Sequence, residues 1–182
     1  MARYLQKMET LKSHLGDLIL AWGGLELTLA SITSHLFCGS DERVPLFYTI
    51  VSNHARAQFL EKCVLTSKLS KDDAAKIIKI QKRFLRLNIT RNKYVHSTYG
   101  TFNVGKVDES SEERIKGICI SDLTRKPEQS EEFYALLKPL NASEIKNHCA
   151  AVYKLWGDAA AMSDEILSTD LLRKAETNMA ST

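Results

Sequence analysis

The hydrophobic and polar positions between Lys71 and Gly100 follow the period of an α-helix. At 3.6 residues per turn, one wide face of this segment is apolar, which is typical of a helix that faces a core. The apolar positions are Ile77, Ile78, Ile80, Phe84, Leu85, Leu87 and Ile89. The pattern therefore predicts one long helix over 71–100, and we expect the other helices of the chain to pack around it.

The same face becomes polar toward its end. Its next positions are Asn88, Arg91, Asn92 and His96, and only Val95 remains apolar among them. Buried polar groups without partners are costly. These side chains could be satisfied by neighbouring residues, could lie beyond the end of the bundle, or could form a functional site.

Four further helices are predicted from apolar periodicity. The first covers about 3–37 and has an apolar seam at alternating steps of four and three residues, suited to packing along another long helix. A short helix over 41–50 has Pro45 in its first turn, where proline is tolerated. A third starts at Ser52 or Asn53 and ends near Leu69, and the last covers about 141–168. We expect the tail over 169–182 to be frayed and flexible.

The segment 101–140 has a different pattern, with short alternating or β-rich stretches separated by polar loops. It predicts a small antiparallel hairpin or meander. We find no internal repeat and no second core. The prediction is therefore one domain over 1–182, an all-α, up-and-down helical bundle that carries a small antiparallel β insertion.

Two features of the first helix leave alternatives open. Glu26 lies beside the apolar seam, either as a solvated carboxylate at its edge or as a partly buried carboxylate that orients a cation on a neighbouring helix. Gly16, Gly23 and Gly24 each cost roughly 1 kcal/mol relative to alanine inside a helix. They indicate a close backbone approach or a slight kink near Trp22.

The composition is that of an ordinary globular chain: 182 residues, 44% hydrophobic, 26% charged and a formal net charge of +3. The four cysteines are far apart and form no CxxC pair, so we expect buried thiols in a reducing compartment and no zinc site. No apolar run approaches the length needed to cross a membrane, and we expect a cytoplasmic protein without membrane contact, metal or cofactor.

Arg91 and His96 are the residues with the clearest chemical potential. In an ideal helix they are separated by about 140° of rotation and roughly 7.5 Å of rise, with Asn92 between them. A guanidinium can hold a phosphate with paired donors, and an imidazole can transfer protons near neutral pH. Together they could cleave RNA without a metal. A symmetric dimer would supply a second histidine.

Structural explanations compete with this hypothesis. Arg91 could pair with Glu26, and His96 could interact with the helix C-terminus. The opposite face of the predicted helix is basic and could attract RNA phosphates, although such a face is more often simply solvated. Its members are Lys76, Lys79, Lys82, Arg83, Arg86 and Lys93.

The stretch RNKYVH, Arg91 to His96, resembles the Arg-polar-x-x-x-His signature of HEPN domains, which are helical bundles of prokaryotic toxin and defence proteins. The upstream AWGGLELTL, Ala21 to Leu29, resembles the Trp-containing first helix of many small bacterial members. The order of predicted helices is also similar. The resemblance covers roughly 5–100, and 141–168 in outline.

This resemblance implies a metal-independent endoribonuclease that acts as a homodimer, with Arg91 and His96 catalytic and Asn92 supporting them. We add Asn88, Glu26 and Tyr99 as candidate supporting or substrate-binding residues. One large branch of the family has a nucleotidyltransferase antitoxin as its partner. Toxins of that branch often have a modifiable tyrosine two residues after the histidine, where this chain has Thr98.

Some HEPN members are not enzymes. The alternative hypothesis is therefore a non-catalytic module that binds nucleotides or proteins or mediates dimerisation. A third hypothesis, a plain structural helical protein, requires the polar side chains at the end of the 71–100 helix to be satisfied within one subunit.

Overall fold

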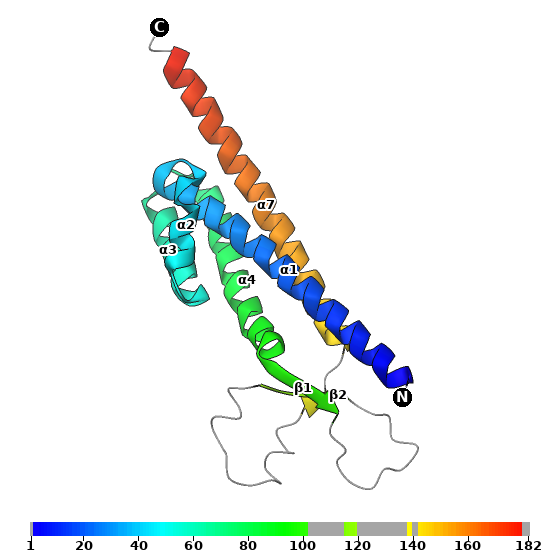
Figure 1. Cartoon of the computed structure of the whole chain (residues 1–182). Coiled ribbons are helices and arrows are strands. Elements are labelled where there is room, and N and C mark those ends of the chain that lie inside the picture. The colour runs from blue at the N-terminus through cyan, green and yellow to red at the C-terminus, as the bar shows by residue number, and fades with distance from the viewer. Residues whose placement is uncertain (1, 102–114, 120–137, 140–141, 180–182) are drawn as a thin grey trace. The chain divides into compact units, whose positions relative to one another are not determined.

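The computed structural model describes residues 2–101, 115–119, 138–139 and 142–179 of the chain, and most of them are helical (Figure 1). The helices are α1 (Ala2–Cys38), α2 (Val44–Thr49), α3 (Asn53–Thr66), α4 (Lys71–Val95) and α7 (Ala142–Met179), with a 3₁₀ turn at Asp41–Arg43. The predicted all-α bundle character is confirmed.

Helix boundaries follow local signals for most of the bundle. Gly39, with φ of 72°, ends α1, and its N–H donates to the carbonyl of His35 at 2.8 Å. Ser52 caps α3 by accepting from the N–H of Ala55, and Ser70 caps α4 by accepting from the N–H of Asp73. These starts agree with the predicted ones.

Two predicted ends are wrong. Helix α4 ends at Val95 instead of Gly100, because the β-branched and aromatic residues after it form the strand β1 (Ser97–Thr101). Helix α7 continues to Met179 instead of ending near Ser168. No glycine or proline follows Gly157, so nothing in the sequence interrupts the hydrogen bonding of this helix.

The strands form a small antiparallel sheet. Strand β1 pairs with β2 (Ile115–Cys119), with Ser97 opposite Cys119, and β2 pairs with β3 (Lys138–Pro139). Strands β2 and β3 fall inside the predicted insertion over 101–140, whereas β1 starts before it. The remaining parts of that insertion, 102–114 and 120–137, lie outside the described residues.

The residues group into two compact units. The first comprises Met1–Ile19 and Ile89–Ala150, and the second comprises Leu20–Asn88 and Ala151–Thr182. The three long helices α1, α4 and α7 contribute residues to both units.

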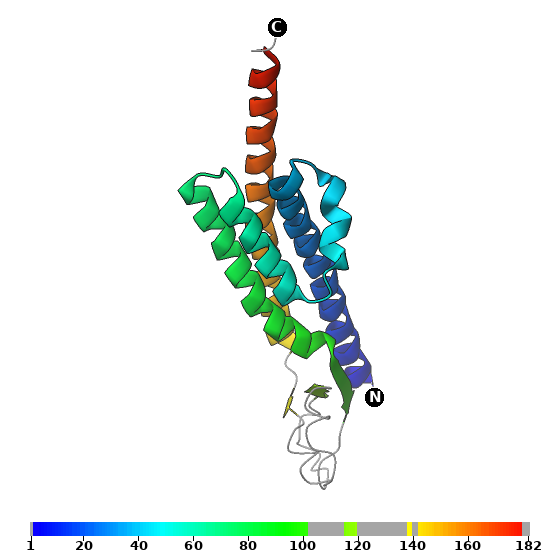
Figure 2. The ribbon, with the colours of Figure 1, turned by 90° about the vertical axis from the view of Figure 1, so that its left-hand side faces the viewer.

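In the second unit, aromatic and amide side chains join the helices. The ring of Trp22 on α1 stacks on that of Phe84 on α4, with centroids 4.9 Å apart. Helices α3 and α4 lie side by side (Figures 1 and 2), and Gln81 Nε2 on α4 donates to the carbonyl of Ala57 on α3 at 3.2 Å. The apolar face predicted for α4 is buried at Ile77, Ile80 and Phe84. Ile89, which the pattern placed on the same apolar face, is exposed.

Gly24 permits a close approach between α1 and α7. A Cβ at this position would lie 2.5 Å from Cζ2 of Trp156, whose Nε1 donates to Thr28 Oγ1 at 3.1 Å. Gly16 and Gly23 have nothing within 4 Å of the corresponding position. The predicted close approach is therefore confirmed at Gly24 and not at the other two.

By length and composition alone, the segment Met8–Cys38 of α1 could span a membrane, with a mean hydropathy of 1.4. The expectation that no apolar run is long enough to cross a membrane is therefore wrong. A core helix of a soluble bundle has the same properties, and Trp22, Leu25 and Leu29 of α1 are buried.

The contact at Gly24 gives a stability prediction. Gly24→Ala should lower the free energy of unfolding by about 1–3 kcal/mol, because the added methyl group would overlap the Trp156 ring. Gly23→Ala is the matched control. It should raise that free energy by about 0.5–1 kcal/mol, since its neighbourhood is open and alanine favours the helix. Urea unfolding of the two variants would measure both effects, and equal changes would contradict the described packing.

Candidate functional site at the end of α4

The predicted catalytic residues lie at the C-terminal end of α4, in the first unit. Arg91 is partly buried, and its Nη1 donates to Asn92 Oδ1 at 3.1 Å. His96 follows the last helical residue and is exposed to solvent. Its backbone N–H donates to the Asn92 carbonyl at 3.0 Å, which continues the helical pattern one residue beyond the helix. Asn92 therefore contacts both residues, one through its side chain and one through its backbone.

A second histidine lies in the same unit. His148 on α7 is buried, and its ring meets that of Tyr94 on α4 edge-on, with centroids 5.6 Å apart. Burial lowers the pKa of His148 below its ordinary value of 6.5. Its Nε2 has no hydrogen-bond partner among the described residues. Burial also raises the pKa of Tyr94, and Glu144 adds to that effect.

The sequence pattern did not identify His148 as a candidate site residue. The available signal was its place in the apolar pattern of the last helix, three residues after Ile145 and four before Val152, both of which are buried. A histidine on such a face is often only a core residue, so the pattern alone gave no reason to select it.

Glu26 lies in the second unit and is a partly buried carboxylate, with 18% of its side chain exposed. Its Oε1 accepts hydrogen bonds from Trp22 Nε1 at 2.9 Å and from Arg56 Nη1 at 3.3 Å. The structure thus decides the question left open by the sequence. Glu26 orients a cation on a neighbouring helix, and that cation is Arg56 on α3.

Asn88 belongs to the same hydrogen-bonded network. Its Oδ1 accepts from Asn53 Nδ2 at 2.8 Å, and Asn53 Oδ1 accepts from Arg56 Nη1 at 3.1 Å. Arg56 also donates from Nε to the carbonyl of Ile50 at 2.9 Å. We call Glu26, Arg56, Asn53 and Asn88 the Glu26–Asn88 network.

Two aromatic rings surround Arg56. Its guanidinium carbon lies 5.5 Å from the centre of the Phe47 ring and 5.3 Å from that of Tyr48, within the range of a cation–π interaction. Burial raises the pKa of Tyr48, and the nearby Glu26 charge adds to this effect. Arg56 and Asn53 were not among the predicted site residues. The available signal was their position in the first turn of α3, directly after the Ser52 cap.

The structure therefore divides the predicted site residues. Arg91, Asn92 and His96 are connected to one another in the first unit. Glu26 and Asn88 are connected through Arg56 and Asn53 in the second. Tyr99 lies in β1, and its side chain is outside the described residues.

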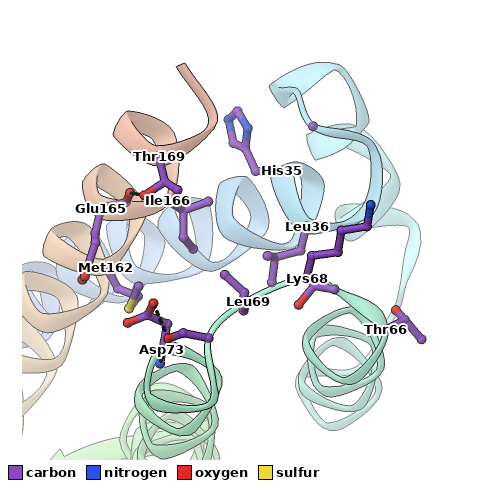
Figure 3. A pocket seen from close by; sticks show the side chains of 13 residues that line it. His35, Leu36, Thr66, Lys68, Leu69, Asp73, Met162, Glu165, Ile166 and Thr169 are labelled. Atoms are coloured by element: carbon purple, nitrogen blue, oxygen red, sulfur yellow. Dashed lines mark hydrogen bonds between the residues drawn. The ribbon is translucent and has the colours of Figure 1, made fainter. Parts of the chain in front are cut away.

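A cavity of about 390 Å³ in the second unit is lined by residues of α1, α4, α7 and the segment between α3 and α4 (Figure 3). Its walls include Leu36, Leu69, Met162 and Ile166 together with polar groups such as Lys68. Among the predicted site residues whose side chains the structure describes, none lines this cavity. Within the described part of the chain, no group of three His, Cys, Asp or Glu residues could hold a metal ion.

His35 is a polar side chain of the cavity wall with only 9% of its side chain exposed. Among the described residues, neither of its ring nitrogens has a hydrogen-bond partner, although Nε2 lies 3.3 Å from Asp41 Oδ1. Ser31 Oγ donates to the same carboxylate oxygen at 2.6 Å. This hydrogen bond is the main cause that lowers the pKa of Asp41, and His35 contributes to the lowering.

No protein-family model, curated protein or solved structure matches this chain.

The Glu26–Arg56 pair should be more strongly coupled than an exposed pair. A double-mutant cycle of Glu26→Ala and Arg56→Ala should give about 1.5–3 kcal/mol, because both side chains are more than four-fifths buried. The control is Arg83 with Asp158, which are 2.7 Å apart but 33% and 44% exposed. This cycle should give less than about 1 kcal/mol. A larger coupling in the control, measured by urea unfolding, would contradict the described burial.

His148 should make stability depend on pH. Its pKa in the folded chain is below 6.5, so the unfolded chain binds more protons as the pH falls through 6.5. Stability should therefore be full above this pH and decrease below it. His148→Phe should make the decrease between pH 7 and pH 5 shallower, while His54→Gln, at an exposed position, should leave that slope unchanged. Parallel slopes for His148→Phe and the parent chain would refute the assignment.

Proposed function

We propose that this protein is a metal-independent endoribonuclease of the HEPN type, in which Arg91 and His96 act on the scissile phosphate. The observation that carries the proposal is the arrangement at the end of α4, where Asn92 bonds to the Arg91 side chain and to the His96 backbone. A guanidinium held in place and a solvent-exposed imidazole are the two groups that such cleavage requires.

The reaction uses the RNA itself as nucleophile. The ribose 2′-oxygen forms a bond to phosphorus while the bond from phosphorus to the leaving 5′-oxygen breaks. A base takes the proton of the 2′-hydroxyl, and an acid gives a proton to the leaving oxygen. His96 performs one of these transfers, and Arg91 stabilises the negative charge that develops on the phosphate oxygens.

One imidazole does not serve as base and acid in the same step. We infer that a homodimer places two copies of the α4 end at one site, so that the second His96 performs the other transfer. His148 is a poor substitute because it is buried and carries a lowered pKa. The resemblance to HEPN toxins supports the dimer and makes a nucleotidyltransferase antitoxin a candidate partner. Within this proposal, the sheet formed by β1, β2 and β3 is an insertion into a HEPN-like bundle.

One observation limits the proposed catalytic group. Glu26 and Asn88, both expected to support catalysis, have hydrogen-bond partners inside the second unit. Their polar character is thus explained by the bundle itself. We therefore remove both from the proposed catalytic group and keep Arg91, Asn92 and His96.

Cleavage of RNA by the purified full chain in EDTA tests the proposal. Arg91→Ala and His96→Ala should each lower the cleavage rate by about 10²–10⁴-fold, since each removes a group that acts in the transition state. His54→Ala is the matched control, because His54 is an exposed histidine of the second unit. It should leave the rate unchanged. Circular dichroism would verify that all three variants are folded.

Other results of the cleavage experiment would lead to different conclusions. Cleavage that requires a divalent cation would contradict a metal-independent mechanism. Equal rates for the parent, Arg91→Ala and His96→Ala would assign the activity to another site or to a contaminant. Tight RNA binding without cleavage would support the non-catalytic module.

A further inference from the structure

The solvent-facing side of α4 has an unusual charge distribution. From Lys76 to Val95 the helix contains no aspartate or glutamate. Its cations in this stretch are Lys76, Lys79, Lys82, Arg83, Arg86, Arg91 and Lys93. The acidic residues of the helix, Asp72 and Asp73, lie in its first turn, so no cation after Lys76 has an acidic residue three or four positions away with which to form the pairs that usually neutralise exposed helices.

Helix α7 neutralises two of these cations within the second unit. Lys76 Nζ lies 2.8 Å from Asp73 Oδ1 and 3.4 Å from Glu165 on α7. Arg83 Nη1 lies 2.7 Å from Asp158 Oδ2 on α7. Lys76 and Arg83 therefore hold α4 against α7, and their charges are largely compensated.

Three cations of the same unit are not compensated in this way. Lys79, Lys82 and Arg86 are exposed, and none of them forms an ion pair with any residue that the structure describes. In an α-helix these positions fall within an arc of about 60° and span about 10 Å along the axis. They form a short line of positive charge, which we call the basic track.

We propose that the basic track binds the phosphate backbone of RNA. This inference rests on the proposed function, which makes RNA the substrate. Successive phosphates of a stacked strand are about 3.4 Å apart along its axis, so the track can contact about three of them. A rigid helix also holds the charges in line without further loss of backbone entropy on binding.

The buried apolar face of α4 favours RNA over a membrane as the partner. A helix that lies on a lipid surface inserts apolar side chains between the headgroups. Here Ile77, Ile80 and Phe84 are buried within the unit. The exposed apolar neighbours of the three cations on this side of α4 are Ala75, which is too small to insert, and Ile89, three positions after Arg86. One such large side chain is far less than the apolar face with which a helix inserts into a lipid surface.

Salt-dependent binding of an uncleavable 2′-O-methyl RNA oligonucleotide tests the inference separately from catalysis. Fluorescence anisotropy of the full chain in EDTA, at 50–300 mM KCl, gives the slope of log K against log salt. Each lost contact with a single strand should reduce this slope by about 0.7. The triple variant Lys79→Gln, Lys82→Gln, Arg86→Gln should therefore have a slope shallower by about 2.

A second triple variant controls for net charge. Lys12→Gln, Lys146→Gln, Lys154→Gln removes the same charge from exposed positions of α1 and α7. It should leave the slope within about 0.5 of that of the parent chain, because these residues do not contact the oligonucleotide.

The outcomes separate this inference from the proposed function. If the parent chain does not cleave RNA but the track variant alone loses salt-dependent binding, the inference holds and the nuclease proposal fails. If both triple variants change the slope equally, or the parent does not bind RNA at 50 mM KCl, the inference is wrong. Binding of the parent to vesicles with 30% phosphatidylserine, lost in the track variant and unaccompanied by RNA binding, would overturn it in favour of a membrane surface.

Discussion

The carboxylate of Glu26 imposes the main physical constraint on the second unit. A charge with less than a fifth of its side chain exposed must be compensated by partners, because desolvation of an unpaired carboxylate is costly. Trp22 and Arg56 provide the compensation from α1 and α3. Trp22 also stacks on Phe84 of α4, so one indole ring connects the polar network to the apolar core. Helices α1, α3 and α4 are thereby joined through Glu26 and Trp22.

The Glu26–Asn88 network shows that the polar residues on α4 do not all have the same role. Asn88 is satisfied by Asn53, and Asn53 is in turn bonded to Arg56. Its polar character is therefore structural. Arg91, one turn later, bonds to its neighbour Asn92, and His96 presents its imidazole to solvent. The change from apolar to polar along one helix face thus combines residues that stabilise the bundle with residues that we propose act on RNA.

Much of the bundle could be predicted from the sequence because helix signals are local. The serine caps at Ser52 and Ser70 and the glycine at 39 follow from hydrogen bonding and backbone conformation within a few residues. The end of α4 could not be predicted in this way, because the pairing of Ser97 with Cys119 joins residues far apart in the sequence. The same reason hid the partners of Glu26. Spacing indicated that it could hold a cation, and only the packing of α3 against α1 identified Arg56.

The residues of the candidate site were predictable in part. The pattern identified Arg91, Asn92 and His96, which the structure connects, but it also included Glu26 and Asn88, whose hydrogen bonds belong to the bundle. It did not identify His148, because a histidine on the apolar side of α7 has the periodicity of a core residue. Periodicity places a residue on a face of a helix, whereas the distinction between a structural and a functional polar group depends on its partners.

The chemistry of the cleaved ends tests the central claim most directly. Attack by the 2′-oxygen leaves a 2′,3′-cyclic phosphate on one fragment and a 5′-hydroxyl on the other. Mass spectrometry of RNA fragments produced by the purified chain in EDTA should therefore find these two groups. Cleavage should also stop when the 2′-hydroxyl at the cleaved position is replaced by hydrogen. Fragments with 3′-hydroxyl and 5′-phosphate ends would mean that water is the nucleophile, and they would contradict the mechanism assigned to Arg91 and His96.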